Sequence, residues 1–137
     1  MFNIGFIGTG LMGLPMAKNI LKSGYKLIVY NRSKEKLEPL KKCGAHICSS
    51  IGDLVSNSEV VITMLTGDKA VDEVIGSKEF LNNLKSGSIV IDMSSTKPIT
   101  ATKLADNLKL KNTHFLDAPV SGGTIGAEEA SLAIMVG

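Results

Sequence analysis

A turn built from three glycines, placed directly after an apolar run, limits the fold of this chain more than any other feature. The run Ile4-Gly5-Phe6-Ile7 has the composition of a buried strand, and Gly8-Thr9-Gly10-Leu11-Met12-Gly13 follows it at once. Gly8 permits a tight turn, Gly10 lets the backbone approach a ligand, and Gly13 lets the next helix pack close to the strand. Unpaired N–H groups and the positive end of the helix dipole would then face an anion. The turn predicts a site for a dinucleotide pyrophosphate, although any sharp strand-to-helix turn can use glycines.

The residues after this turn continue the pattern of a strand-helix-strand unit. Pro15 stands in the first turn of the helix expected at residues 12–23, where its missing N–H costs little. Apolar residues then recur with helical spacing at Met16, Ala17, Ile20 and Leu21. Gly24 ends the helix, and a second apolar run covers residues 27–30. The polar residues Asn31, Arg32 and Ser33 follow about 20 residues after the glycines, where a dinucleotide-binding unit recognises the ribose.

Apolar runs alternate with stretches of helical spacing along the whole chain. The runs cover residues 4–7, 27–30, 45–48, 60–65, 89–93 and 115–116, and helices are expected at residues 12–23, 34–43, 51–57, 69–75 and 99–110. This alternation predicts a doubly wound α/β fold, in which a mostly parallel sheet carries helices on both faces. Residues 130–136 predict one further strand, antiparallel to the strand at 113–116 and joined to it through the glycine-rich residues 121–126.

Length and composition favour a single domain that covers residues 1–137. Of the 137 residues, 44% are hydrophobic and 20% are charged, which allows one hydrophobic core. The formal net charge of +2 is too small to indicate a nucleic-acid partner. No stretch reaches the roughly 20 apolar residues of a membrane span, and no basic and apolar leader precedes the first strand. We therefore expect a cytoplasmic protein with neither nucleic acid nor membrane as a partner.

The cysteines and histidines do not form a pattern of metal ligands. Cys43 and Cys48 stand five positions apart without a second cluster, so we expect reduced thiols and no metal site. His46 and His114 lie at the start of or within expected strands, where packing and surface roles outweigh catalytic ones.

Two spaced motifs resemble a known enzyme family. The stretch GTGLMGLPMAKN, from Gly8 to Asn19, resembles the N-terminal signature of the β-hydroxyacid dehydrogenases, a group that contains 3-hydroxyisobutyrate dehydrogenase, tartronate semialdehyde reductase and, more distantly, 6-phosphogluconate dehydrogenase. Asp117-Ala118-Pro119-Val120-Ser121-Gly122-Gly123, with Gly126-Ala127 and Met135-Val136-Gly137, is similar to the substrate-binding motif of that family. The strand ends Val61-Ile62-Thr63-Met64-Leu65 and Asp92-Met93-Ser94-Ser95-Thr96 resemble its cofactor-lining segments. The resemblance implies a Rossmann-like, NAD(P)-binding domain.

The end of the second strand bears on the choice of cofactor. An NAD site usually has an acidic residue there to accept the ribose hydroxyls, whereas this chain has Asn31 followed by Arg32 and Ser33. Arg32 would lie against the adenine and bind a 2′-phosphate, with Ser33 and Lys36 as further donors, unless Arg32 is an ordinary surface residue. NADP is therefore favoured, while NAD remains an alternative because relatives with an Asn-Arg pair accept both.

The resemblance also implies which other residues line the cofactor. Met64 and Leu65 would form an apolar wall near the riboses, and Thr96 would lie close to the nicotinamide carboxamide, although strand-end packing explains Met64 equally well. The complete set of expected cofactor-binding residues is Gly8, Thr9, Gly10, Leu11, Met12, Gly13, Asn31, Arg32, Ser33, Met64, Leu65 and Thr96.

Ser121, Gly122 and Gly123 are the expected binding site for the carboxylate of a small carboxylic-acid substrate. A serine hydroxyl beside two glycine N–H groups forms a neutral, donor-rich concavity with no Cβ in the way, and the alternative is a simple hairpin turn. A little further on, Ala130-Ser131-Leu132 stands where the family more often has Gly-Thr-Leu.

Three functions are compatible with these residues. The first is the cofactor domain of a dehydrogenase or reductase of a small β-hydroxyacid or its semialdehyde. The second is the same domain of 6-phosphogluconate dehydrogenase, which fits Ala118-Pro119-Val120 less well, and the third is a non-catalytic dinucleotide-binding module. Relatives use a lysine beyond the Ser-Gly-Gly segment, and no lysine follows Lys111 here. We therefore expect no catalytic residue in this chain and a catalytic lysine in a helical domain that follows it. We also expect the intact protein to be a homo-oligomer.

Overall fold

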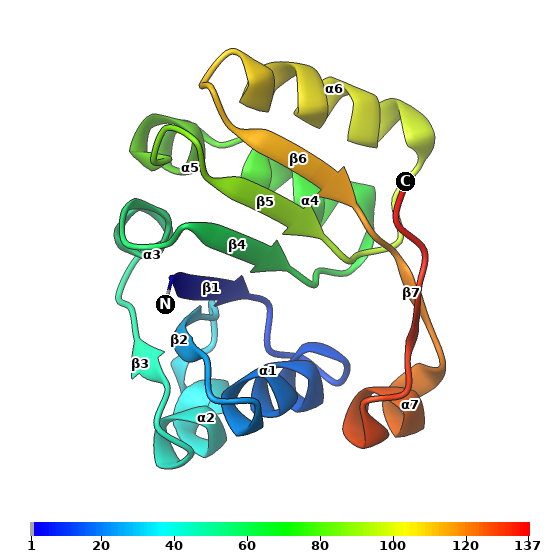
Figure 1. Ribbon diagram of the computed structural model, residues 1–137. Helices are drawn as coiled ribbons and strands as arrows, with labels where there is room; N and C mark the ends of the chain where they lie inside the picture. Colours follow the sequence, from blue (N-terminus) through cyan, green and yellow to red (C-terminus); the bar gives the residue numbers. More distant parts are fainter. Residues whose placement is uncertain (1) are drawn as a thin grey trace.

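A six-stranded parallel sheet forms the centre of the computed structural model, which describes residues 2–137 (Figure 1). The strands are β1 (Asn3–Ile7), β2 (Lys26–Tyr30), β3 (His46–Ile47), β4 (Val60–Thr63), β5 (Ile89–Asp92) and β6 (His114–Asp117). Their order across the sheet is β3-β2-β1-β4-β5-β6, and every neighbouring pair is parallel. The predicted α/β fold with a doubly wound, mostly parallel sheet is confirmed.

Helices cover both faces of this sheet, as the alternation of strands and helices predicts. On one face lie α1 (Gly13–Lys22), the 3-10 helix η1 (Lys34–Leu37) and α2 (Glu38–Lys42), and on the other lie α3 (Ile51–Ser56), α4 (Gly67–Ile75), α5 (Lys78–Asn83) and α6 (Pro98–Lys109). The expected helix at residues 34–43 is thus divided into η1 and α2. Helix α5 was not predicted, because it is short and buries only Phe80.

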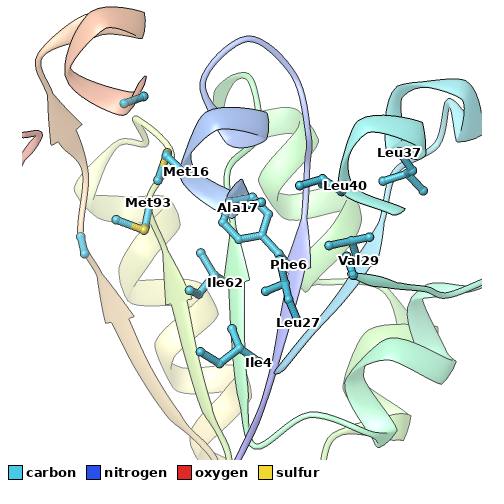
Figure 2. Close-up of a cluster of buried hydrophobic side chains, with 13 residues drawn as sticks. Ile4, Phe6, Met16, Ala17, Leu27, Val29, Leu37, Leu40, Ile62 and Met93 are labelled. Atoms are coloured by element: carbon cyan, nitrogen blue, oxygen red, sulfur yellow. The ribbon is translucent and has the colours of Figure 1, made fainter. Parts of the chain in front are cut away.

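Alternate residues of each strand supply the two halves of the hydrophobic core. Phe6 and Val29 face α1 and α2, whereas Ile7 and Ile28 face the helices on the opposite side of the sheet. Figure 2 shows the first of these clusters, in which Phe6 lies next to Ala17 of α1. Both Phe6 and Ala17 have no exposed surface, so the helix that follows the glycine turn is held tightly against the sheet.

The last part of the chain forms a small unit of its own, and here the sequence-based prediction was wrong. The strand expected at residues 130–136 is β8 (Ala133–Ile134), which pairs antiparallel with β7 (Val120–Ser121) and not with the strand at 113–116. The glycine-rich segment does not form a plain connection, because Gly122 (φ +139°) and Gly123 (φ +64°) turn the chain into helix α7 (Gly123–Glu129). Helix α7 buries Ala127, and this packing brings the returning strand next to β7.

Ala130 stands where the Gly-Thr-Leu pattern of the family has glycine, and its backbone conformation is one that favours glycine. It follows α7 in the left-handed conformation, with φ +57° and ψ +38°, and its side chain is exposed. A Cβ in this conformation costs about 1–2 kcal/mol, which glycine avoids. Glycine is therefore the favoured residue at this position, and alanine occupies it under strain.

Replacing Ala130 with glycine is expected to stabilise the protein by about 0.5–1 kcal/mol. The relief of left-handed strain is partly offset by the greater freedom of glycine in the unfolded chain. Urea denaturation of the two proteins measures the difference in unfolding free energy. Ala105→Gly, inside α6, is the matched control and should destabilise by a similar amount. An Ala130→Gly protein that is no more stable than wild type would rule out strain at this residue.

Candidate functional site

Two glycines of the turn after β1 are required by the packing of the protein itself. Gly8 has φ +101°, and a Cβ there would collide with the carbonyl oxygen of Met64, at the end of β4. A Cβ on Gly13 would collide with the Gly8 carbonyl oxygen and would lie 3.2 Å from Cε1 of Phe6. The glycine loop, residues 8–13, is therefore pressed against both the sheet and the start of α1.

Gly10 differs from these two glycines because no packing requires it. Within residues 2–137, no heavy atom other than those of Gly10 and its two chain neighbours lies within 4 Å of the position that a Cβ on Gly10 would take, and the residue does not have a positive φ. Among residues 2–137, the backbone N–H groups of Leu11 and Met12 have no hydrogen-bond acceptor, and the first turn of α1 carries no acidic side chain. The loop thus presents free donors beside an open space, as an anion-binding loop does.

Asn31 joins the glycine loop to the end of β2. Its Oδ1 accepts a hydrogen bond from the Thr9 N–H at 3.1 Å, and its Nδ2 donates to the Ser33 carbonyl oxygen at 3.1 Å. Both ends of the amide are therefore used within the protein, so Asn31 acts by holding the two loops together. Thr9 is similarly turned inward: it is buried, and its hydroxyl has no hydrogen-bond partner in the described part of the chain.

Cationic side chains follow the end of β2, and lysines line a cavity beside the glycine loop. Arg32 and Lys36 are exposed, Ser33 is half-buried, and neither cation forms an ion pair with any residue of the described chain. A cavity of about 600 Å³ is lined by Gly10 and Leu11 from the loop together with Lys36 from η1. Lys18, Lys22, Glu35 and Glu128 also line it, so lysines outnumber acids on its wall.

Hydrogen bonds connect the end of β4 to the loop after β5 and to the end of β1. The Leu65 N–H donates to the Ser94 hydroxyl at 2.8 Å, and the Met64 N–H donates to the Ile7 carbonyl oxygen at 3.0 Å. Met64, Leu65 and Thr96 are all half-buried at this edge. The predicted cofactor residues that follow β1, β4 and β5 therefore lie together at the carboxyl end of the sheet. Open α/β sheets bind their ligands at this end.

Asp68 fixes the segment that contains Thr96. Its Oδ2 accepts hydrogen bonds from the Thr100 hydroxyl at 2.6 Å and from the Lys97 N–H at 2.9 Å. The hydrogen bond from Thr100, and to a lesser extent that from Lys97, lowers the pKa of Asp68, because both stabilise the carboxylate. The loop after β5 is thus anchored to the start of α4.

Asp92 is a buried carboxyl group that the sequence did not single out. Its Oδ1 accepts hydrogen bonds from the Thr63 hydroxyl at 2.8 Å and the Ser94 N–H at 3.2 Å, whereas its Oδ2 is buried without a partner in residues 2–137. Burial raises the pKa of Asp92 and outweighs these hydrogen bonds, which favour the ionised form. Since Ser94 also accepts from Leu65, Asp92 supports the wall formed by the two strand ends.

Replacing Asp92 with asparagine is expected to make the protein relatively more stable as the pH rises. The folded-state pKa of Asp92 is raised above its unfolded value, so ionisation at higher pH costs the wild type stability. Asparagine cannot ionise, and the difference in unfolding free energy should therefore move in favour of the variant as the pH rises above the ordinary pKa of an aspartate, about 3.9. Urea denaturation at several pH values measures this difference. A constant difference, or one that moves toward wild type, would contradict a raised pKa.

The segment Ser121-Gly122-Gly123 forms an exposed turn between β7 and α7. Gly122 packs near Leu132, whose Cδ2 lies 3.1 Å from the position of a Cβ, whereas Gly123 has open space around that position. Figure 1 shows β7 and α7 beyond the carboxyl ends of the sheet strands, with α7 beside α1. Residues 121–123, called the substrate turn after their predicted role, thus lie on the same side of the molecule as the glycine loop.

Residues 2–137 form neither a cluster of metal ligands nor a membrane-spanning helix. No group of three or more His, Cys, Asp or Glu side chains is arranged to hold a metal ion. None of the helices in this part of the chain is long and apolar enough to cross a membrane. Both cysteines are free thiols, and burial raises the pKa of Cys48 to about 11.

Known proteins resemble the chain over nearly its whole length. Residues 3–137 match the family described as the NAD binding domain of 6-phosphogluconate dehydrogenase. An uncharacterized oxidoreductase of Bacillus subtilis, YkwC, is 47% identical over 135 residues, which cover 98% of this chain and 47% of the relative. Human mitochondrial 3-hydroxyisobutyrate dehydrogenase is 38% identical over 135 residues, which cover 98% of this chain and 40% of the enzyme.

Solved structures also resemble the chain over nearly its whole length. Psf3, solved in complex with NADP+ and 2-OPP, superimposes with a TM-score of 0.92 at 32% identity, over 97% of this chain and 48% of that protein. The chain therefore spans about half the length of the curated relatives and solved structures that it matches.

Proposed function

Because the chain belongs to the family of the NAD-binding domain of 6-phosphogluconate dehydrogenase, we propose that its glycine loop holds the pyrophosphate of a nicotinamide dinucleotide. The observation that carries this proposal is the contrast among the three glycines. Gly8 and Gly13 are required by packing, but only a ligand gives a reason for a glycine at Gly10, where a Cβ would fill the open cradle. The N–H groups of Leu11 and Met12 would donate to the phosphate oxygens.

The protein to which this domain belongs is proposed to oxidise a small β-hydroxyacid or to reduce its semialdehyde. Support comes from relatives named 3-hydroxyisobutyrate dehydrogenase and from the resemblance of residues 117–123 to a substrate-binding motif. The bound nicotinamide would supply or accept the hydride. Met64 and Leu65 would shield the riboses from water, and Thr96 would orient the nicotinamide carboxamide.

The substrate turn would receive the carboxylate of this acid. The Ser121 hydroxyl and the backbone N–H groups of Gly122 and Gly123 are exposed, and no Cβ blocks the approach to either glycine. Hydride transfer from an alcohol carbon also needs a group that accepts the hydroxyl proton. We propose that a lysine in a segment of the intact protein beyond residue 137 performs this role, as the family resemblance implies.

NADP is the proposed cofactor in preference to NAD. The end of β2 carries an amide that is bonded within the protein and no carboxylate to repel a 2′-phosphate. Arg32 has no carboxylate partner in residues 2–137, and Lys36 lines the cavity next to Gly10. The bound NADP+ of Psf3 supports this preference by analogy.

Replacing Arg32 with alanine is expected to weaken NADPH binding about tenfold or more and to leave NADH binding within about twofold. The lost charge-assisted hydrogen bond to the 2′-phosphate is worth about 1.5–3 kcal/mol, and NADH has no such phosphate. Calorimetric titration of both proteins with both cofactors measures the affinities. Lys78→Ala, which removes an exposed positive charge from α5, is the control and should change neither affinity. Unchanged NADPH affinity in Arg32→Ala, or tenfold tighter NADH binding by wild type, would refute the preference.

A further inference from the structure

Few polar contacts attach the last part of the chain to the rest of the molecule. Residues 118–137 comprise β7, α7 and β8, and among the described residues only one side-chain hydrogen bond links them to the remainder. In this bond Asn19 of α1 donates from Nδ2 to the carbonyl oxygen of Ala127, in α7, at 2.6 Å. Two backbone bonds add to it, from the Ala118 N–H to the Asp92 carbonyl oxygen and from the Gly137 N–H to the Asp117 carbonyl oxygen, each at 2.8 Å, and both lie at the end of β6 and not at α7. The orientation of α7 therefore depends strongly on Asn19.

The apolar surroundings of Asn19 leave this hydrogen bond to determine how α7 lies on α1. An apolar groove of about 420 Å³ runs between α1, the sheet and α7, and its walls include Met16, Ile20, Ala127 and Leu132. Of the described residues that line this groove, only Asn19 has a polar side chain. Apolar contacts have no preferred direction, so they hold α7 close to α1 without setting how far it slides or rotates. The hydrogen bond from Asn19 is directional, so it fixes the position and rotation of α7 on α1.

Asn19 lies on the helix that begins at the glycine loop, and its acceptor lies in the helix that begins at the substrate turn. The Gly126 N–H bonds back to the Gly122 carbonyl oxygen at 3.0 Å, and the Ser131 N–H bonds to the Gly126 carbonyl oxygen at 2.9 Å. A rotation or shift of α7 would therefore carry Gly122 and its neighbours with it. The position of α7 on α1 sets the distance between the two loops.

We infer that Asn19 is a positioning residue, which fixes α7 on α1 and so holds the substrate turn in place relative to the glycine loop. Its role as a link between substrate and cofactor rests on the proposed function. The Asn19 side chain forms no hydrogen bond with either loop among residues 2–137, and it lines the cavity that also contains Gly10 and Leu11; its effect on the substrate turn is exerted through α7.

The test uses two variants of Asn19 and one control. Asn19→Asp keeps the shape but removes the donor, and Asn19→Leu removes both polar groups in an apolar groove. Asn83→Ala is the control, because Asn83 also donates from its side chain to a backbone carbonyl oxygen, that of Glu79 at 2.8 Å, but lies on α5. In the 137-residue chain, hydrogen exchange of the Gly126 and Ser131 amides should become about tenfold faster in both Asn19 variants. NADPH affinity should stay within about twofold of wild type in Asn19→Leu, which adds no charge to the cavity beside Gly10.

In the intact protein, both variants should raise the KM for the hydroxyacid about tenfold, and Asn19→Leu should change the KM for the dinucleotide little. Unchanged exchange at Gly126 and Ser131 in both variants would overturn the inference, as would faster exchange without any rise in the KM for the hydroxyacid. If one variant unfolds, the other decides the outcome. Failure of the proposed function has a different signature, since wild type itself would then neither bind the dinucleotide nor turn over a hydroxyacid, and the exchange result would still test the contact.

Discussion

Gly10→Val is expected to weaken the binding of NADPH and NADH alike by about 100-fold or more, while the protein stays folded. The valine side chain would occupy the open space beside the Leu11 and Met12 N–H groups, where the pyrophosphate is proposed to lie. Each charge-assisted hydrogen bond lost in this way is worth about 1.5–3 kcal/mol, so the loss of two accounts for at least this factor. Calorimetric titration measures the affinities, and urea denaturation measures the stability.

Gly13→Ala provides the matched comparison within the same loop. Its Cβ would collide with the Gly8 carbonyl oxygen and crowd the Phe6 ring, so this variant should lose about 1–3 kcal/mol of stability. Gly10→Val should keep nearly all of its stability, because no atom of another described residue, apart from the two chain neighbours, lies within 4 Å of its Cβ position. A Gly10→Val protein that binds dinucleotide as wild type does would show that the pyrophosphate lies elsewhere.

The second large effect concerns catalysis by this chain alone. The 137-residue chain is expected to bind the dinucleotide but to show no turnover of 3-hydroxyisobutyrate, glycerate or 6-phosphogluconate with either NADP or NAD. Loss of a general acid–base group lowers rates by about 10²- to 10⁴-fold, and the surfaces contributed by the rest of the intact protein would be missing as well. An absorbance assay at the nicotinamide band measures turnover, with the intact protein as the positive control.

Each of the other outcomes of this turnover assay would show which part of the proposed function is wrong. Robust turnover by the 137-residue chain would show that a catalytic base lies within it. Turnover of 6-phosphogluconate in preference to smaller acids by the intact protein would place it with 6-phosphogluconate dehydrogenase. An intact protein that binds dinucleotide, lacks a lysine in the expected segment and turns over none of the acids would be a binding module.

The sheet and the glycine loop could be predicted because local patterns determine both. Apolar runs separated by helical stretches specify parallel strands, and the glycines between the run at residues 4–7 and the next helix specify a sharp turn. The loops that carry Asn31, Leu65 and Thr96 were placed at one edge of the sheet because each follows a strand. These features need no information about distant residues.

The remaining features depend on contacts between distant parts of the chain. The sequence shows that Asn31 is polar, but not that both ends of its amide bond to Thr9 and Ser33. It gives no sign that Asp92 is buried with one unpartnered oxygen, since an acid at a strand end is ordinarily exposed. The pairing of β8 with β7 was also missed, because α7 docks on α1 through Asn19 and Ala127, which are far apart in sequence.

Amide chemical-shift mapping of the chain during titration with NADP tests the central claim most directly, since it locates the dinucleotide residue by residue. The proposed site predicts the largest shifts at the Gly10, Leu11 and Met12 amides, which face the pyrophosphate, with further shifts near Arg32 and Thr96. The amide of His46 lies in β3, two strands from β1, in a residue that lines a separate cavity with Asn3 and Lys26 at the amino ends of β1 and β2, and it should not move. Shifts confined to residues outside the glycine loop, or no saturable shifts at all, would contradict the proposal that this domain binds a dinucleotide through Gly8–Gly13.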